Sequence, residues 1–213
     1  MEFRDRTEAG EALCQSLTKY KGKDVIVFAL PRGGVITAAP IALFLNAHLD
    51  LLITRKIGHP SQPEYALAAI AENGDILVGN EDELSDVDQE WLRNKIKKEK
   101  KEAKRRREAY LAGRKQAGVK GKIAIIVDDG IATGLTIKAA IAAMKKKNPQ
   151  KIVVAVPVAP EETISEIKKS VDDVVCLIKE VYGQFRGSVG AYYREFPQVT
   201  DDEVVKAMSD ASQ

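Results

Sequence analysis

Five short runs of apolar, β-branched residues recur along the chain and limit the folds that it can adopt. Each run is almost continuously hydrophobic instead of alternating, which is typical of strands that are covered on both faces. We expect strands at 24–30, 49–55, 122–128, 151–158 and 173–179. Helical stretches follow several of them, at 34–46, 135–148 and 161–170. This alternation predicts an α/β fold in which helices flank both faces of a Rossmann-like parallel sheet.

Composition narrows the class of protein. The chain has 213 residues, 45% hydrophobic and 30% charged, which suits one domain with a sizeable core. With two cysteines and two histidines, we expect neither a disulfide framework nor a metal site built on these residues. The net charge of +2 does not argue for a nucleic-acid partner. No run is long enough to span a membrane, and the acidic start differs from a signal peptide, so we expect a cytoplasmic protein without a membrane partner.

The two ends and one central segment are predicted to add further helices. Asp5 with Glu8, and Thr200 with Glu203, have the spacing of a capping box. Residues 86–115 hold twelve Lys or Arg and predict one long helix, capped by Ser85 and Asp88, with one packed stripe through Ile96, Ala103 and Tyr110. Such a basic run can bind RNA, but its interspersed glutamates favour a solvated helix with one packed face.

The segment "IAIIVDDGIATGLT" (123–136) carries the strongest functional signal. Asp128 and Asp129 follow a buried strand directly, at the sheet edge where open α/β folds bind ligands. The turn 130–136 then leads into a helix, so its backbone amides and two threonine hydroxyls offer donors to an anion. Acceptors for sugar hydroxyls beside donors for a phosphate fit a sugar phosphate. The alternative is that the two acids only cap the turn.

Other phosphate-binding motifs do not match this segment. A Walker loop needs a lysine after its second glycine, and Leu135 follows Gly134 here. The dinucleotide fingerprint GxGxxG is absent from this turn. A DxD aspartyl phosphatase would need an acid at position 130, which is glycine.

"VDDGIATGLT" resembles the phosphoribosyl-pyrophosphate (PRPP) motif of the type I phosphoribosyltransferases. The resemblance implies that Asp128 and Asp129 hold the ribose 2- and 3-hydroxyls. It also implies a loop around the 5-phosphate, made of Gly130, Ala132, Thr133, Gly134, Leu135 and Thr136. Leu135 stands where the family usually has glycine, which narrows the backbone angles open to that position.

Two further segments resemble loops of the same family, in the family's order. "ALPRGGV" (29–35) matches the pyrophosphate loop, in which Arg32 supplies charge, Gly33 and Gly34 permit close approach, and a non-proline cis peptide is frequent. The alternative for this segment is a plain Pro-Gly turn between strand and helix. Residues 54–74 match the mobile catalytic loop, where Arg55 and Lys56 would meet the pyrophosphate. His59 in this loop would contact substrate or remain solvated.

The resemblance covers nearly the whole chain and implies one phosphoribosyltransferase domain over 1–213. A small hood would come from about 1–20 and 180–213, and residues 86–115 would be a helical insertion. The segments "FRDRTEAGEAL", "RKIGHPSQPE" and "VGAYYREFPQVTDDEV" are similar to those of a mostly uncharacterised bacterial subset of the family.

The implied activity is a glycosyltransferase reaction of nucleotide metabolism, the transfer of 5-phosphoribose from PRPP to a nitrogenous base or related amine. Mg²⁺ would be bound through PRPP, with help from Asp128 and Asp129, and the catalytic groups would be these two acids with Arg32, Arg55 and Lys56.

The base is unidentified, because "AVPVAPEE" (155–162) lacks the lysine of the 6-oxopurine members. Base contact by the hood aromatics, and a homodimer, are left open; those aromatics are Phe185, Tyr192, Tyr193 and Phe196. The alternative is a non-catalytic protein that senses PRPP or a nucleotide.

Overall fold

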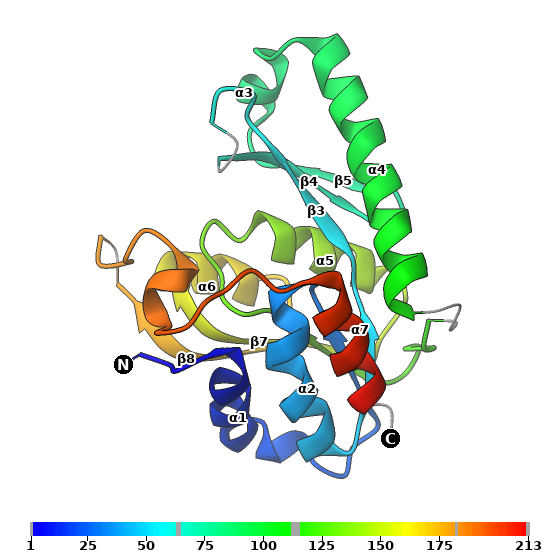
Figure 1. The fold of residues 1–213 in the computed structure, drawn as a ribbon, viewed down its shortest axis with the longest axis vertical. Helices are drawn as coiled ribbons and strands as arrows, with labels where there is room; N and C mark the ends of the chain where they lie inside the picture. Colours follow the sequence, from blue (N-terminus) through cyan, green and yellow to red (C-terminus); the bar gives the residue numbers. More distant parts are fainter. Residues whose placement is uncertain (1, 63–64, 112–115, 182, 212–213) are drawn as a thin grey trace.

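The computed structural model describes residues 2–62, 65–111, 116–181 and 183–211. Its centre is a five-stranded sheet in the order β2-β1-β6-β7-β8, with every neighbouring pair parallel. The predicted α/β class and parallel sheet are therefore confirmed (Figure 1). The strands are β1 (Val25–Ala29), β2 (His48–Leu51), β6 (Ile123–Val127), β7 (Lys151–Pro160) and β8 (Asp173–Glu180).

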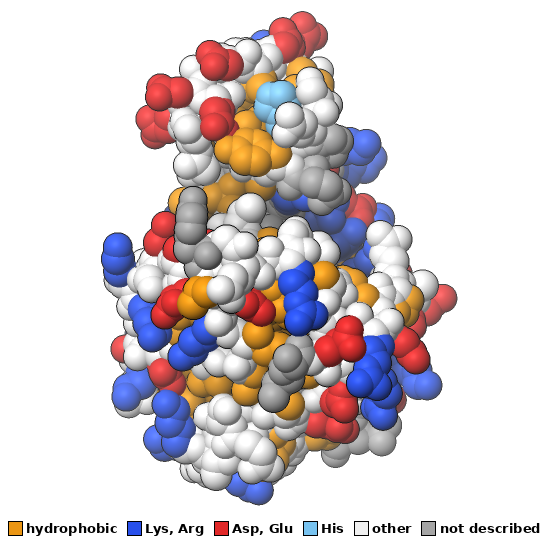
Figure 2. Space-filling view, turned by 90° about the vertical axis from the view of Figure 1, so that its left-hand side faces the viewer, with side chains coloured by type: hydrophobic (Ala, Val, Ile, Leu, Met, Phe, Trp, Pro, Cys, Tyr) orange, Lys and Arg blue, Asp and Glu red, His pale blue; other side chains and the backbone are white. Residues whose placement is uncertain are grey.

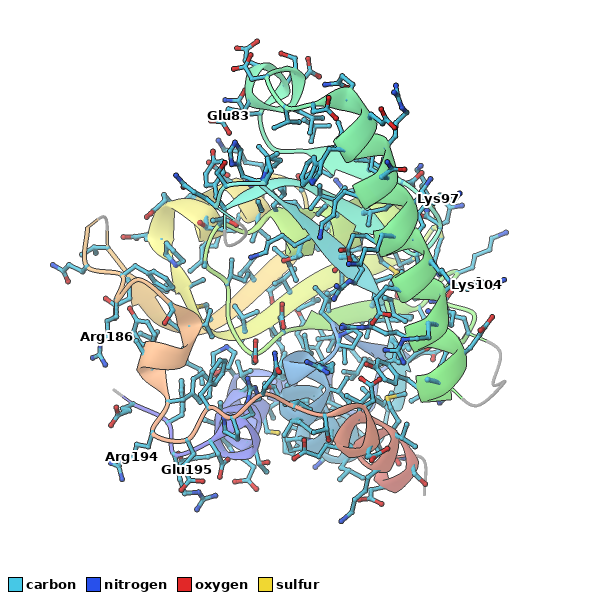
Figure 3. All side chains as sticks on the ribbon, turned by 45° about the horizontal axis from the view of Figure 1, so that its top comes forward. Glu83, Lys97, Lys104, Arg186, Arg194 and Glu195 are labelled. Carbon is cyan, nitrogen blue, oxygen red and sulfur yellow. The ribbon has the colours of Figure 1, made fainter. Side chains whose placement is uncertain are left out.

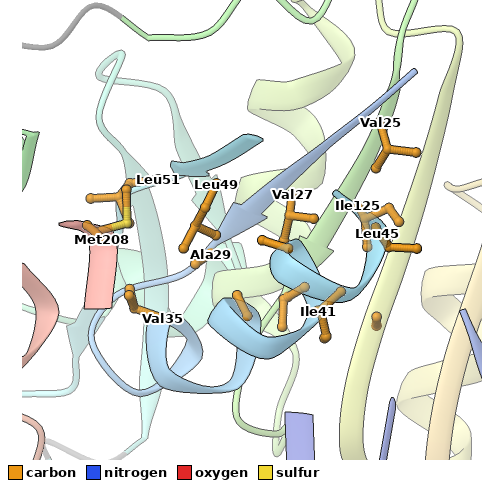
Figure 4. Packing of buried hydrophobic residues seen from close by; sticks show 14 of the residues in the cluster. Val25, Val27, Ala29, Val35, Ile41, Leu45, Leu49, Leu51, Ile125 and Met208 are labelled. Carbon is orange, nitrogen blue, oxygen red and sulfur yellow. The ribbon is translucent and has the colours of Figure 1, made fainter. Parts of the chain in front are cut away.

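Helices cover both faces of this sheet, because alternate residues of the buried strands point to opposite sides. Helices α1 (Arg6–Ser16), α2 (Gly33–Leu45) and α7 (Asp201–Asp210) cover one face, and α5 (Leu135–Lys145) and α6 (Glu161–Lys168) cover the other. Figure 4 shows the first of these layers, where β1 side chains meet α2 and Met208 of α7. On the opposite side, Ile26 and Phe28 pack in the cluster that includes α5 and α6.

A second, antiparallel sheet of β3 (Thr54–Gly58), β4 (Ala66–Ala71) and β5 (Ile76–Val78) stands above the first, followed by α3 (Glu81–Ser85) and α4 (Gln89–Leu111). We call β3–β5, α3 and α4 together the flap. Its sheet lies between α4 on one face and α5 on the other. Figure 2 shows acidic side chains gathered at the top of the flap, where the first turn of α3 carries three acids.

Two predictions for this region were wrong. The expected strand 49–55 ends at Leu51, because the chain leaves the main sheet after Leu52 donates to the Ala29 carbonyl, and Thr54 begins the flap sheet. The segment 54–74, expected to be a loop, is mostly a β3–β4 hairpin. The connection between these two strands includes residues 63–64, which lie outside the described residues.

Helix α4 confirms the predicted long helix with different ends. The Trp91 amide donates to Asp88 Oδ1 over 2.6 Å, so Asp88 caps the helix as expected. Ser85 is not a cap, since it is the last residue of α3, and residues 112–115 lie outside the described part of the chain. Ala103 and Tyr110 are buried, which confirms one packed face.

The two ends of the chain meet beside the carboxyl ends of the strands. The Phe3 amide donates to the Tyr192 carbonyl over 2.9 Å, and the Arg194 amide donates to the Phe3 carbonyl over 2.9 Å. Thr200 and Glu203 form the full capping box that was predicted. At Asp5 only half of the box is present, because the Glu8 carboxylate accepts from the Arg4 amide instead. Among the described residues, no helix has the length and apolar character needed to cross a membrane.

Candidate active site

The candidate site lies where the strand order of the main sheet reverses direction. Strand β1 pairs with β2 on one side and with β6 on the other, and both β1 and β6 end at the same edge. Open α/β sheets bind ligands in the crevice at such a point. The loop after β1 carries "PRGG" and the loop after β6 carries "DDGIATG", so the topology brings the two predicted motifs to one place.

The acidic pair and the glycine pair are in direct contact. A Cβ built on Gly33 would lie 1.9 Å from Asp129 Oδ2, and one on Gly34 would lie 3.0 Å from the Asp128 Cα. Helix α2 can begin against the acids only because both residues lack side chains. The peptide bond between Pro31 and Arg32 is cis, as the resemblance implied.

The two acids have different surroundings. Asp129 Oδ2 accepts from Arg6 Nε over 2.7 Å, and both side chains are largely buried, with 17% and 9% of their surface exposed. Asp128 accepts from the Asp129 amide over 2.9 Å. Burial and the neighbouring charge of Asp129 raise the pKa of Asp128 well above its ordinary value. Two neighbouring acids with this little access to water are more than a turn cap needs.

Arg6 is a site residue that the sequence reasoning missed. Besides pairing with Asp129, it donates from Nη1 to the Pro197 carbonyl over 2.8 Å, and its guanidinium lies 3.6 Å from the centre of the Phe196 ring. Both Arg6 and Pro197 belong to segments that are similar to the bacterial subset of the family. The available signal was an arginine directly after the helix cap Asp5, at a position that proves to be buried.

The hood contacts the acidic pair through the side chain of Tyr193. The Tyr193 hydroxyl donates to the Asp129 carbonyl over 2.6 Å, and its ring lies 4.8 Å from that of Phe196. Burial, followed by the charge of Asp129, raises the pKa of Tyr193 above its ordinary value. Tyr192 is fully buried, and its hydroxyl accepts from the Arg186 amide. Base contact by any of these rings stays a prediction.

The turn after the acids is fixed by glycine and leads into α5. Gly134 has φ +76° and is the residue before the helix, where a Cβ would lie 2.6 Å from Thr163 Cγ2. Ala132 and Thr133 are exposed and Thr136 is half-buried. The first amides of α5 have no carbonyl of their own helix to bond, so this turn can receive an anion.

The structure gives a packing role to Leu135, which stands where the PRPP motif usually has glycine. Its side chain is buried and packs with Ala69 of β4 and Ala139 of α5, and Leu77 of β5 joins the same cluster. Leu135, which stands where the family usually has glycine, therefore packs the flap against the phosphate loop.

Arg32 lies in the pyrophosphate loop, directly before α2, and faces a carboxylate. Its Nη1 is 3.5 Å from Asp201 Oδ1, at the start of α7. Asp201 also accepts from the Tyr110 hydroxyl over 2.6 Å and from Arg105 Nη2 over 2.9 Å, and both of these donors belong to α4. Its bond with Tyr110 is the main cause that lowers the pKa of Asp201. The sequence does not single out Asp201, which lies within the ending that is similar to the bacterial subset of the family.

The other two predicted cations lie on the flap. Arg55 Nε donates to Glu99 Oε2 of α4 over 2.8 Å. Arg55 and Lys56 line a cleft between β3 and α4, and neither the acidic pair nor the phosphate loop contributes to the described lining of that cleft. The site residues therefore fall into two groups: Arg32, Gly33, Gly34 and the segment 128–136 at the sheet edge, and Arg55 with Lys56 on the flap.

An acid pair and a glycine-bounded turn at the switch point of a parallel sheet are typical of α/β proteins that bind a ligand there. The family model for the phosphoribosyl transferase domain matches residues 6–189. The structure of TT1426 from Thermus thermophilus is similar, with 36% identity, a TM-score of 0.79 and 99% of each chain covered. The chain therefore belongs to the phosphoribosyl transferase domain family.

Other relatives fit the same assignment. A protein of Mycobacterium tuberculosis strain H37Rv, named provisionally as a phosphoribosyl transferase, is 42% identical over 205 residues, or 95% of this chain. The chain spans 45% of the length of that relative. The structure of AQ2163 from Aquifex aeolicus shares the fold, with 13% identity and a TM-score of 0.51, over 85% of this chain and 76% of that one.

Proposed function

We propose that this chain transfers 5-phosphoribose from PRPP to a nitrogen of a base or related amine and releases pyrophosphate, with Mg²⁺ as cofactor. The observation that carries the proposal is the contact of Gly33 and Gly34 with Asp129 and Asp128. Through that contact, the loop suited to pyrophosphate and the loop suited to ribose 5-phosphate share one crevice. A ligand with a phosphate at each end of a ribose matches this arrangement.

The proposed chemistry needs no nucleophile from the protein. The bond between C1 of the ribose and the pyrophosphate oxygen breaks, the acceptor nitrogen bonds to C1 from the opposite face, and that nitrogen loses a proton. Asp128 and Asp129 would orient the ribose through its hydroxyls and favour the positive charge that develops near C1. Arg32 would stabilise the departing anion, and Arg55 and Lys56 would join it from the flap.

The residues present fit Mg²⁺ as a shared ligand of protein and substrate. The described residues contain no cluster of three or more metal-binding side chains, so the ion would take most of its oxygens from PRPP and water. Asp128 would supply a hard oxygen, and its raised pKa reflects a carboxylate whose charge a divalent ion would stabilise. When bound, Mg²⁺ neutralises negative charge on the pyrophosphate.

Asp128→Asn tests the proposal because it separates binding from folding. The amide keeps the bond from the Asp129 amide and removes a buried charge, so the thermal midpoint should rise or stay level. Loss of a charge-assisted bond of about 1.5–3 kcal/mol should weaken Mg²⁺–PRPP binding at least about tenfold. Calorimetric titration and melting curves measure both effects, with Asp202→Asn, an exposed acid on α7, as the control.

Turnover distinguishes the enzyme from a sensor. The protein is incubated with PRPP, Mg²⁺ and a panel of bases and amines, and released pyrophosphate is measured. Release with one acceptor, lost in Asp128→Asn, supports the transferase. Tight PRPP binding without release for any acceptor would instead favour the non-catalytic alternative, and unchanged PRPP affinity in Asp128→Asn would contradict both.

A further inference from the structure

A cleft of about 610 Å³ opens between strand β3 and helix α4 of the flap. A volume of this size is within the range of small-molecule sites. Figure 2 shows basic side chains in the hollow where the flap meets the body of the molecule. The charged and aromatic residues that line the cleft are Arg55, Lys56, Trp91, Lys95, Lys98 and Glu99.

A buried carboxylate organises the cations of this cleft. Glu99 is 5% exposed at its side chain, and its two oxygens accept separately, from Arg55 Nε over 2.8 Å and from Lys95 Nζ over 2.9 Å. Both cations are thereby held at the wall of the cleft in fixed positions. Lys98 lies one turn further along α4, is exposed and forms no ion pair within the part of the chain that the structure describes. Leaving Lys56 aside, Arg55, Lys95 and Lys98 bring three positive charges to this lining against the one carboxylate of Glu99, which leaves the described part of the cleft positive.

Trp91 supplies a planar surface beside these charges. Trp91, Lys95 and Lys98 are spaced so that they share one face of the helix, toward β3. The indole is half-buried and packs with the apolar cluster under α4, which includes Leu92, so its position is fixed before any ligand binds. A half-exposed aromatic ring next to cations is suited to a ligand that has both a ring and negative charge.

We propose that this cleft binds a nucleotide-type anion, with its planar ring against Trp91 and its phosphates between Arg55, Lys95 and Lys98. The proposal goes beyond the transfer reaction, because the acidic pair and the phosphate loop do not contribute to the described lining of the cleft. Arg55 and Lys56 are the residues that this cleft shares with the proposed transfer site. Pyrophosphate alone would leave Trp91 without a partner.

The charges on the rest of α4 argue for a small anion over an RNA strand. Arg105, Arg106 and Arg107 follow on the same helix, and each is paired with a carboxylate, of Glu102 or Glu72. Arg105 also pairs with Asp201. These three arginines thus face three carboxylates, whereas Arg55, Lys95 and Lys98 of the cleft face only Glu99. The excess positive charge is therefore local to the cleft, whereas a polynucleotide needs a continuous basic track.

The test uses the fluorescence of Trp91, which is the only tryptophan in the chain. ATP is titrated into the full chain with excitation at the red edge of the indole band, and inorganic tripolyphosphate is added as a competitor. We expect saturable quenching by ATP that weakens with salt, and displacement of ATP by tripolyphosphate. Lys98→Gln should weaken ATP binding about tenfold without changing the thermal midpoint, since Lys98 is exposed.

Lys97→Gln is the matched control. It makes the same change on the same helix, and Figure 3 places Lys97 on the outer side of α4, outside the cleft lining. We expect its ATP affinity to equal that of the unmodified protein. Absence of saturable quenching, or equal weakening by the two variants, would overturn the proposal, as would tighter binding of a mixed RNA pool that both variants weaken equally.

A second arm separates this site from the PRPP site. Asp128 lies outside the cleft lining, so Asp128→Asn should leave the quenching of Trp91 by ATP unchanged. Loss of quenching in that variant would assign the ligand to the crevice at the sheet edge and overturn a separate flap site. The result does not depend on turnover, so a failure of the transferase assay leaves this test intact.

Discussion

At the residue scale, the ion pair between Arg6 and Asp129 bonds the first residue of helix α1 to the acidic pair. The two residues are 123 positions apart in sequence, and their bond is 2.7 Å long. Because both side chains are largely buried, removing either one leaves a charge with little access to water. Asp129 therefore combines a role in the proposed site with a role in joining α1 to the sheet edge.

Arg6→Met should lower the free energy of unfolding by about 3 kcal/mol, the size expected when one partner of a buried pair is lost. Adding Asp129→Asn to the same chain should recover part of this loss, because the uncompensated charge disappears. Denaturant unfolding of the two single variants and the double variant measures the coupling. Arg4→Met is the control, since Arg4 is 60% exposed in its pair with Asp5, and its cost should stay within about 0.5 kcal/mol. Equal losses for Arg4→Met and Arg6→Met would contradict a buried pair.

At the element scale, helix α5 joins the phosphate loop to the flap through its first residue. Leu135 packs against Ala69, on the face of the flap sheet opposite to α4. Leu135→Ala should remove this contact and cost about 2–3 kcal/mol, since it leaves a cavity. Hydrogen exchange should then accelerate in β4 and β5 more than in β1 and β6. Ile137→Val, in the cluster under the main sheet, should show no such preference for the flap; uniform acceleration in Leu135→Ala would count against a seated flap.

Helix α4 contains a pH-sensitive group of ion pairs at Glu102. This carboxylate accepts from Arg105 Nε over 2.7 Å and from Arg106 Nε over 2.8 Å, and the bonds from Arg105 and then Arg106 lower the pKa of Glu102 to about 2. Because folding lowers this pKa, the stabilisation is fully present above about pH 4.5 and is lost as the pH falls toward 2. Arg105 is half exposed, so we expect a contribution of only about 1 kcal/mol.

Glu102→Gln should remove that contribution, so that the variant and the unmodified protein differ at pH 7 and converge near pH 2. Thermal melts across this range measure the difference. Glu108→Gln is the control, because Glu108 and Lys104 are 3.9 Å apart and both are exposed. A constant difference at every pH would show that the charge of Glu102 is not the cause.

The elements that the sequence predicted correctly share one property: the residues that identify each of them are contiguous in the sequence. The strands of the main sheet are continuous apolar runs, and the two motifs are contiguous segments, so Asp128, Asp129, Gly33 and Gly34 could all be located. The β3–β4 hairpin could not, because "ALAAIA" of β4 is rich in alanine, a poor strand former, and two prolines precede it. Arg6, Glu99 and Asp201 were missed because the partner that links each of them to a predicted site residue is distant in sequence. Those partners are Asp129, Arg55 and Arg32, which lie 123, 44 and 169 positions away.

At the scale of the whole molecule, Asp201 is the point where flap, C-terminal helix and pyrophosphate loop meet. It accepts from Tyr110 and Arg105 of α4 and lies 3.5 Å from Arg32. Burial and the bond to Asp201 raise the pKa of Tyr110 to about 12, so this hydroxyl stays a donor at neutral pH. The position of the flap helix is therefore linked to the cation that the proposed mechanism uses for the leaving group.

Asp201→Asn tests this link because it changes one charge that serves two elements. Removing a negative charge beside Arg32 should strengthen binding of inorganic pyrophosphate by about twofold to fivefold, the size of one charge screened by water and salt. It should also lower the free energy of unfolding by about 1 kcal/mol, since two donors of α4 lose a charged acceptor. Calorimetry and melting curves measure the two effects, with Asp202→Asn, the exposed neighbour on α7, as the control expected to change neither. Weaker pyrophosphate binding in Asp201→Asn would reverse the interpretation, because Asp201 would then hold Arg32 in its binding position instead of competing for it.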